Sequence, residues 1–301
     1  MRIAFTGKGG SGKTTIASLF ARVAAQDGCP VLALDADINQ HLAMAIGYSG
    51  IMRSMGTEVM AIKRHLLGTN ARATVETMHK TMPPGSGSRL VRVDTTDWFI
   101  QEFAVHHEGV WLAGAGEIPE GNVGVRCYHG LNGAVELVLG HLVDRQEDIV
   151  VVDMTAGADA FSSSLFTKVD ALALVVEPTL KSIGVYRQFL DHAKQWNIPL
   201  IVIANKVQDD EDRAFISEQI ANMAVWLPLS GAVRRQERDG QIRAVEPVMA
   251  DALRAIRDEL CARPIDWSKR EALARKMHQR ASTEFQIDPD FSLLEAILWL
   301  R

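Results

Sequence analysis

One glycine-rich loop near the beginning of the chain constrains the fold more than any other feature. Residues 7–15 read GKGGSGKTT, in which Gly7, four residues, Gly12, Lys13 and Thr14 match the phosphate-binding pattern. A short apolar run precedes the loop, and apolar residues at helical spacing follow it. A strand, a glycine loop and a helix in this order aim backbone N–H groups and the positive end of the helix at one anion. We therefore expect a fold built around a phosphate site.

The residues of this loop are expected to contact a nucleotide. Glycine positions let the backbone approach closely, and the expected contacts are Gly7, Gly9, Gly10, Ser11, Gly12, Lys13, Thr14 and Thr15. Lys13 is expected to neutralise the β- and γ-phosphates, and the Thr14 hydroxyl to hold Mg²⁺. A nucleoside triphosphate and Mg²⁺ are thus the expected cofactors.

Apolar strand-like runs alternate with longer helical patterns, which is typical of a parallel sheet covered on both faces. The runs lie at residues 3–5, 31–34, 110–113, 149–152, 171–176, 200–204 and 225–227. Helices are expected near residues 15–26, 130–144, 181–196 and 211–222. The expected fold is a three-layer α/β sandwich with a mostly parallel sheet, helices on both faces and a C-terminal helical extension.

The chain is expected to divide near residue 262. Residues 1–262 read as one nucleotide-binding domain, and residues 263–301 as the helical extension. Residues 49–108, with a flexible Pro-, Gly- and Ser-rich link at 83–88, read as an insertion between the second and third sheet strands. The extension has an amphipathic pattern at 266–284 and a second apolar stripe at 293–300. We expect packing on the body or on a partner, because the last ten residues carry one basic side chain, whereas membrane-binding helices have a basic face.

Composition favours a soluble protein of a reducing compartment. The 37 acidic residues exceed the 32 basic ones, which gives no electrostatic support for nucleic-acid binding. Three widely spaced cysteines argue against a disulfide framework. The chain opens directly on a strand-like run, and no apolar run has the length of a membrane-spanning helix. A cytoplasmic location is therefore expected, with neither nucleic acid nor membrane as a partner.

Two further strands end in carboxylates that are expected at the mouth of the loop. The run IVVVDMTAG at residues 149–157 puts Asp153 at the end of a buried strand, where it would hold Mg²⁺ through water. Gly157 could give its N–H to the γ-phosphate and make this segment a switch. The second strand ends in LDAD, and Asp35 and Asp37 alternate along it, so the two carboxylates cannot share one role. Ligands bind at the carboxyl ends of parallel strands, but on its own pattern this segment is equally consistent with a solvated strand end.

Lys8 is one lysine more than the phosphate pattern requires. A lysine at a loop tip is ordinarily a solvated charge. The string KGGSGKTT, however, resembles the deviant Walker A motif of the SIMIBI-class family that includes the nitrogenase iron protein, the MinD and ParA positioning ATPases, arsenite-pump ATPases and CooC-type nickel-insertion ATPases. The resemblance implies a P-loop ATPase that forms a nucleotide-sandwich homodimer. In that dimer Lys8 would reach the phosphates of the partner subunit, as an arginine finger does.

The same resemblance assigns the remaining roles. The second aspartate of a D-x-D segment orients the attacking water in this family, which gives that catalytic role to Asp37. Asp35 is then structural or an outer-shell partner of Mg²⁺. The segment DMTAG resembles the DMEAG of CooC-type ATPases, and VEPT at residues 176–179 resembles their V-E-P-[ST] segment. Asp159 and Ala160 replace a Glu-His pair that often follows in CooC.

The resemblance also implies how the base is bound. Asn205 and Lys206 stand at a strand end, where an amide can hydrogen-bond an exposed base edge. Relatives specific for GTP add an aspartate two residues after the lysine, whereas this chain has Gln208, so ATP is the expected nucleotide. The backbone around Pro228 is expected to frame the base, and residues 234–240 to run along the dimer edge.

A metal site is the feature that distinguishes the CooC-type branch. Its members carry a G-C-x-C segment, and two subunits pool four thiolates around one ion. The matching segment here is GVRCYHG at residues 124–130. Val125 replaces the first cysteine, Cys127 matches the second, and His129 follows two residues later. A Cys-x-His pair from each subunit would suit Zn²⁺ or Ni²⁺. The alternative is a free thiol beside a loop histidine.

The CooC-like segments predict a dimeric switch ATPase that assists the maturation of a client metalloenzyme or inserts its metal. The alternative is a MinD/ParA-like ATPase of spatial organisation, which needs a membrane or DNA as its matrix and is disfavoured by the acidic net charge. A third candidate is an ATPase that serves an anion pump. Such enzymes usually join two P-loop halves, and this chain has one.

Overall fold

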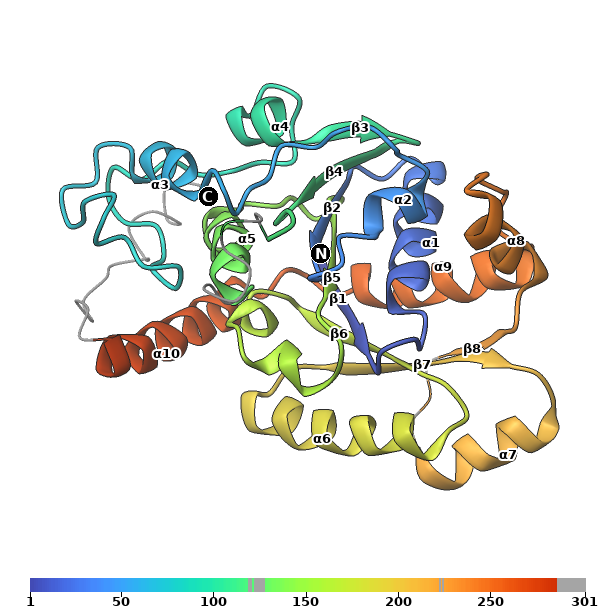
Figure 1. The fold of residues 1–301 in the computed structure, drawn as a ribbon. Coiled ribbons are helices and arrows are strands. Elements are labelled where there is room, and N and C mark those ends of the chain that lie inside the picture. Colours follow the sequence, from blue (N-terminus) through green and yellow to red (C-terminus); the bar gives the residue numbers. More distant parts are fainter. Residues whose placement is uncertain (119–120, 122–127, 222, 224, 286–301) are drawn as a thin grey trace.

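The computed structural model describes residues 1–118, 121, 128–221, 223 and 225–285 (Figure 1). An eight-stranded sheet crosses the molecule in the order β3-β4-β2-β5-β1-β6-β7-β8. The strands are β1 (Arg2–Gly7), β2 (Val31–Ala36), β3 (Val105–His107), β4 (Val110–Gly114), β5 (Ile149–Met154), β6 (Ala171–Val176), β7 (Leu200–Val207) and β8 (Val225–Pro228). All neighbouring strands pair in parallel except β3, which runs antiparallel to β4.

Helices cover both faces of this sheet, which confirms the predicted three-layer α/β fold (Figure 1). One face carries α1 (Lys13–Gln26), α2 (Leu42–Ile46), α8 (Gly231–Asp239) and α9 (Pro247–Cys261). The other carries α3 (Val59–Leu67), α4 (Trp98–Phe103), α5 (His129–His141), α6 (Leu180–Trp196), α7 (Asp210–Gln219) and α10 (Trp267–Phe285). A hydrophobic core lies on each face of the sheet, and strand β1 contributes to both. Ile3 and Phe5 pack into one core, and Ala4 packs into the other, because successive side chains of a strand point to opposite faces.

The expected strands and helices all form, with ends that shift by a few residues. The structure adds β3, an edge strand that the sequence analysis did not predict. His106 and His107 belong to it, and their rings contact Trp111 and Tyr48 respectively.

The segment 83–88 differs from the flexible link that its composition predicts. Pro83, Pro84 and Gly85 are buried, and the amide N–H of Thr69 donates to the carbonyl oxygen of Gly87 at 2.9 Å. The Ser88 hydroxyl accepts from the Asn70 side chain at 3.0 Å. These contacts hold the segment against the loop after α3, whereas its composition predicted a flexible link.

Helix α10 is anchored to the body of the protein by buried ion pairs. Arg270 lies 2.7 Å from Asp144 and 2.6 Å from Asp170, and Leu273 joins the core. The second apolar stripe, at 293–300, lies outside the described residues. None of the described helices is both long enough and apolar enough to span a membrane.

Candidate nucleotide-binding site

The glycine loop joins β1 to α1 in the conformation that the phosphate pattern requires. Gly10 and Gly12 have φ angles of 84° and 96°, in the left-handed region that favours glycine. Gly12 is also the N-cap of α1, and a Cβ atom there would collide with the side-chain amide of Asn205. The loop therefore presents its backbone at a helix N-terminus, which is the geometry of a phosphate site.

Lys13 and Thr14 face the carboxylates of β2 and β5. The Thr14 hydroxyl donates to Asp153 Oδ2 at 2.6 Å. Lys13 Nζ lies 2.5 Å from Asp37 Oδ2 and 3.8 Å from Asp153 Oδ1. Because β1 lies next to β5 and β5 next to β2, three strand ends bring these groups together. The structure thus assembles the four side chains that the sequence analysis had placed at one site.

Burial controls the charge of this site. Burial, followed by repulsion from Asp153, raises the pKa of Asp35 to about 8, although the backbone N–H groups of Leu42 and Asp37 donate to it. Burial also raises the pKa of Asp153 to about 6, and the attraction of Lys13 only partly offsets it. Two buried carboxylates with raised pKa values form a site that favours an added cation.

Asp153 and Thr14 fit the expected Mg²⁺. Asp153 Oδ1 is buried and has no hydrogen-bond partner among the described residues. A buried carboxylate oxygen without a partner is costly unless a cation or water satisfies it. A hydroxyl and a carboxylate are also the oxygen ligands that Mg²⁺ prefers. The residues present therefore suit the ion that the loop motif predicts.

Asp37 is held at the mouth of the loop by two neighbours. Its Oδ1 accepts from both the backbone and the side-chain nitrogen of Asn39 at 2.9 Å. The Tyr128 hydroxyl donates to its backbone carbonyl at 2.5 Å, and the Asn132 side chain donates to the carbonyl of Ala36 at 3.0 Å. Tyr128 is the N-cap of α5 and Asn132 lies in its first turn, so the beginning of this helix positions the carboxyl end of β2. Neither contact was predicted, although Tyr128 directly follows the predicted metal cysteine.

Lys8 has an intramolecular partner that the sequence analysis missed. Its Nζ lies 2.7 Å from Glu177 Oε1, just after the carboxyl end of β6. Lys206 Nζ lies 3.5 Å from the other oxygen of Glu177 and donates to the carbonyl of Gly10 at 2.5 Å. One carboxylate thus ties two lysines to the tip of the loop. The signal was present in the sequence, because Glu177 directly follows a buried strand, where ligand-binding side chains gather.

A cavity of about 370 Å³ opens beside the loop. Its lining includes the predicted residues Gly9, Gly10, Gly12, Lys13, Thr14, Thr15, Asp37, Asn205, Lys206 and Pro228. Arg234 and Glu237 of α8 line it too, and Thr15 donates to Glu237 at 3.0 Å. The Asn205 amide donates to the carbonyl of Ser11 at 2.8 Å, so this group braces the loop.

The other residues predicted for the nucleotide site do not line this cavity. Gly7 and Ser11 lie within the loop, and Asp35 is buried below Asp37. Gly157, with a φ of 67°, begins a 3₁₀ turn, η2 (Gly157–Phe161), next to the lining residue Ala156.

The predicted transition-metal pair falls largely outside the described structure. Cys127 lies outside the described residues, and His129 begins α5 with a side chain that is not described. Within the described ranges, no group of three or more His, Cys, Asp or Glu side chains could hold a metal ion.

Comparison with known proteins agrees with this geometry. The sequence model of the CobQ/CobB/MinD/ParA nucleotide binding domain (CbiA) matches residues 3–244. The chain is 29% identical to the carbon monoxide dehydrogenase accessory protein CooC of Rhodospirillum rubrum over 244 residues, which cover 80% of this chain and 88% of the relative. It is also 29% identical to an uncharacterized ATP-binding protein of Methanocaldococcus jannaschii over 222 residues, which cover 73% and 80% of the two chains.

Solved structures share the fold. The cell division ATPase MinD of Pyrococcus furiosus superposes with a TM-score of 0.59 at 16% identity, over 86% of this chain and 98% of that one. A ParA family ATPase of Chlorobium tepidum gives a TM-score of 0.58 at 17% identity, over 84% and 98%. Because the family match spans the loop, the strand-end carboxylates and the base side of the cavity, the chain belongs to the CobQ/CobB/MinD/ParA nucleotide-binding family, as a SIMIBI-class ATPase similar to CooC.

Proposed function

We propose that the protein is a Mg²⁺-dependent ATP switch that dimerises around its nucleotides and assists the maturation of a client metalloenzyme. The observation that carries the proposal is the set of contacts at the loop mouth, where Lys13 meets Asp37 and Thr14 meets Asp153. A nucleotide bound on the loop would place its phosphates beside these side chains. Binding and hydrolysis would therefore be sensed directly by β2 and β5.

Each side chain has a defined task in this proposal. Thr14 and Asp153 would hold Mg²⁺, which supplies charge neutralisation at the phosphates. Lys13 would exchange Asp37 for the phosphate oxygens, which frees the Asp37 carboxylate to orient water. Gly157 would donate its N–H to the γ-phosphate and report its loss through η2.

Lys8 would complete the site of a second subunit. It lies at the loop tip with a side chain that is 28% exposed and is held by Glu177. Two large apolar side chains at the same mouth support a protein contact there, because Ile38 is 47% exposed and Leu180 is 75% exposed. A symmetric dimer across this mouth would bury both and bring each Lys8 to the opposite nucleotide.

The client is proposed from the relative. CooC of Rhodospirillum rubrum is named as an accessory protein of carbon monoxide dehydrogenase, a metalloenzyme. We propose that this chain serves a metalloenzyme in the same way, in the cytoplasm. Cys127 and His129 from two subunits would carry Zn²⁺ or Ni²⁺ as cargo.

Metal uptake by the purified protein tests the cargo. Wild type and Cys127→Ser are loaded with Zn²⁺ or Ni²⁺ in the presence of ATP, of ADP and of neither nucleotide. We expect one ion per dimer with ATP, and loss of that ion in Cys127→Ser. Uptake that is absent from the ATP-bound dimer, or unchanged in Cys127→Ser, would contradict a metal-carrying role and leave the ATP switch in place.

A further inference from the structure

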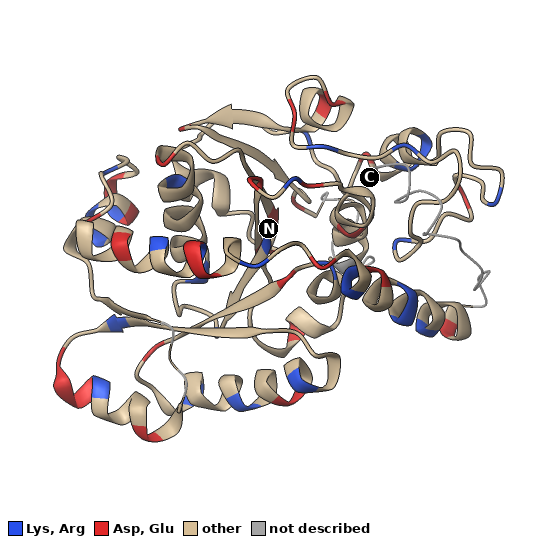
Figure 2. Ribbon diagram, turned by 180° about the vertical axis from the view of Figure 1, so that it is seen from behind, with Lys and Arg blue, Asp and Glu red and all other residues tan. Residues whose placement is uncertain are grey.

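Charge is distributed very unevenly over this acidic protein. Residues 58–92 contain six Lys or Arg and two Asp or Glu, and α10 contains five and two. Two of these cations, Arg270 and Lys80, form ion pairs with acidic residues outside both segments, so the remaining nine carry the excess of positive charge. The rest of the chain carries 21 basic and 33 acidic residues. We call residues 58–92 together with α10 the basic lobe. Figure 2 shows its blue segments gathered at one end of the molecule, away from the acidic helix α7.

The two parts of the basic lobe are in contact although they are far apart in sequence. The Thr81 hydroxyl lies 3.0 Å from His278 Nδ1 and 2.9 Å from His79 Nδ1. The ring of His79 also packs at 5.3 Å from that of Phe285, at the end of α10. The loop after α3 therefore packs against α10.

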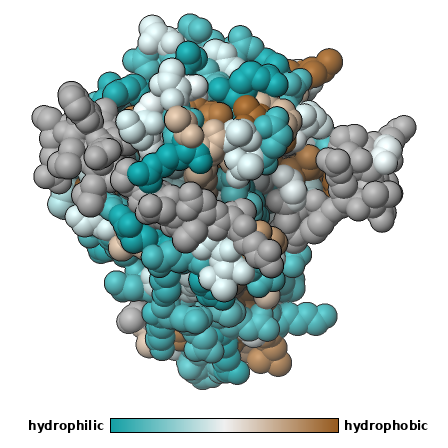
Figure 3. All heavy atoms as spheres, turned by 90° about the vertical axis from the view of Figure 1, so that its left-hand side faces the viewer, coloured by the Kyte–Doolittle hydropathy of each residue, from teal (hydrophilic) through white to brown (hydrophobic). Residues whose placement is uncertain are grey.

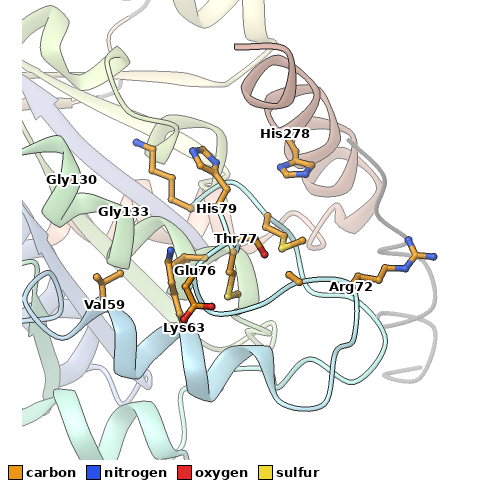
Figure 4. Close-up of a pocket in the computed structure, with 14 residues that line it drawn as sticks. Val59, Lys63, Arg72, Glu76, Thr77, His79, Gly130, Gly133 and His278 are labelled. Atoms are coloured by element: carbon orange, nitrogen blue, oxygen red, sulfur yellow. The ribbon is translucent and has the colours of Figure 1, made fainter. Parts of the chain in front are cut away.

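Two hollows lie on this surface. The first, of about 600 Å³, has an apolar floor that includes Met78 and Met82, and Lys63 and Arg72 line it (Figure 4). Figure 4 shows Arg72 extending outward at one end and His278 reaching in from α10. One acidic side chain, Glu76, lines the same hollow.

The second hollow, of about 460 Å³, has aromatic walls. Phe161, Phe166 and Trp196 line it together with Arg280. Arg280 lies 5.4 Å from the centre of the Trp196 ring, and Lys276 lies 4.2 Å from it. Segment 79–80 borders both hollows, so they are neighbours.

We propose that the basic lobe is a docking surface for an acidic protein segment that anchors apolar side chains in the two hollows. The proposal rests on the proposed function, because the segment would belong to the client. Arg, Met and aromatic side chains are the residue types enriched at protein interfaces. Carboxylates beside an apolar anchor would complement both the basic rim and the apolar floor.

The shape of the surface favours a protein over a lipid bilayer or a DNA duplex. Figure 3 shows this end of the molecule, where hydrophilic residues predominate among the coloured atoms. A helix that binds a membrane instead buries a continuous apolar face in the bilayer. Backbone phosphates need basic side chains but no aromatic-walled hollow, whereas an anchored side chain does.

The hollows are connected to the nucleotide switch by a chain of polar contacts. Lys80 Nζ lies 2.9 Å from Oε1 of the buried Glu136 of α5, and the Ser164 hydroxyl donates to the other oxygen. Ser164 lies three residues after Phe161, which ends η2 and lines the second hollow. A segment bound here would therefore contact residues that follow Gly157. Binding of the segment and of nucleotide should then influence each other reciprocally.

Fluorescence anisotropy of labelled peptides on the full-length protein tests the proposal. The probe is a short peptide of glutamates with interspersed leucine and tryptophan, and the comparison peptide has the same charge with serine in place of the apolar residues. We expect the first peptide to bind at low salt about tenfold more tightly than the second. Its affinity should also differ between protein with a non-hydrolysable ATP analogue and protein with ADP.

The charge-reversing pair Lys63→Glu and Arg280→Glu removes one cation from each hollow. We expect peptide affinity to fall about tenfold or more, whereas the matched double reversal Arg187→Glu and Arg213→Glu, of exposed residues on α6 and α7, should leave it unchanged. Equal affinity for the two peptides, or an equal effect of the control pair, would overturn the proposal. Tighter binding of duplex DNA or of phosphatidylserine vesicles than of the peptide would also overturn it.

ATP hydrolysis and dimer mass are measured in the same samples. If the double variant hydrolyses ATP and dimerises normally but loses the peptide, the docking surface is supported independently of the switch. If the wild type binds the peptide without ATP-dependent dimerisation, the proposed function fails while the surface stands.

Discussion

The nucleotide pocket and the attachment of α10 both bury aspartates, but the pKa values of these aspartates are shifted in opposite directions. At the pocket, burial raises the pKa values of Asp35 and Asp153, so the protein alone leaves these charges poorly compensated. At the attachment, burial would raise the pKa of Asp144, but Arg2 and Arg270 outweigh it and hold that pKa well below its usual range. The first arrangement suits a ligand that comes and goes, and the second suits a permanent joint.

Replacing Lys8 with alanine gives the largest expected effect at the pocket. If Lys8 supplies charge to the partner's phosphates, ATP hydrolysis should fall about a thousandfold. Nucleotide binding to the isolated chain should change little, because Lys13 remains. Phosphate release and fluorescent-nucleotide titration measure the two properties, and Lys194→Ala, at an exposed lysine in the last turn of α6, is the control. A Lys8→Ala variant with normal turnover would refute the trans role.

At the α10 joint, Asp144→Asn should destabilise the fold strongly. The change leaves Arg2, Arg270 and the terminal amine beside a neutral group. We expect the free energy of unfolding to fall by about 3–5 kcal/mol, as for other broken buried ion pairs. Urea unfolding measures it, and Asp251→Asn should change it by less than about 0.5 kcal/mol because that carboxylate is 74% exposed. Similar losses in the two variants would contradict the comparison.

The pH dependence of stability should report the same joint. Since the pKa of Asp144 is lowered in the folded protein, the unfolded chain takes up a proton near about pH 4, whereas the folded protein does so only at lower pH. The contribution of Asp144 is therefore complete above that pH and is lost as the pH falls. Wild type should lose more stability than Asp144→Asn between about pH 6 and pH 3. Parallel curves would show that the ion pairs contribute nothing.

Glu177→Gln gives the smallest expected effect. The Lys8–Glu177 pair is partly exposed, and such pairs are worth less than about 1 kcal/mol. Releasing Lys8 should strengthen ATP-dependent dimerisation about two- to fivefold in sedimentation experiments. Weaker dimerisation would mean that Glu177 positions Lys8 for the partner and does not restrain it.

The pocket and the basic lobe also differ in how far the sequence predicts them. Lys13, Thr14, Asp37 and Asp153 were predictable because each lies in a short motif at a strand end, where the order of strands brings motifs together. The contact between Tyr128 and Asp37 was not predictable, because no local sequence pattern specifies which strand end the beginning of α5 packs against.

The basic lobe was hidden for a related reason. The net charge of the whole chain is −5, and this average concealed a basic region within an acidic protein. His79 and His278 both contact the Thr81 hydroxyl although nearly two hundred residues separate the two histidines, and no periodicity of either segment specifies that arrangement. Pro83 and Pro84 are buried, although the composition of their segment alone predicted a flexible link.

The mass of the protein in solution with ATP, with ADP and without nucleotide tests the central claim most directly. The variant Asp37→Asn, which we expect to hydrolyse ATP slowly, is included to preserve the ATP state. We predict a dimer with ATP, monomers with ADP or without nucleotide, and monomers of Lys8→Ala under all three conditions. A dimer that forms equally in all three conditions, or that forms normally in Lys8→Ala, would contradict the account.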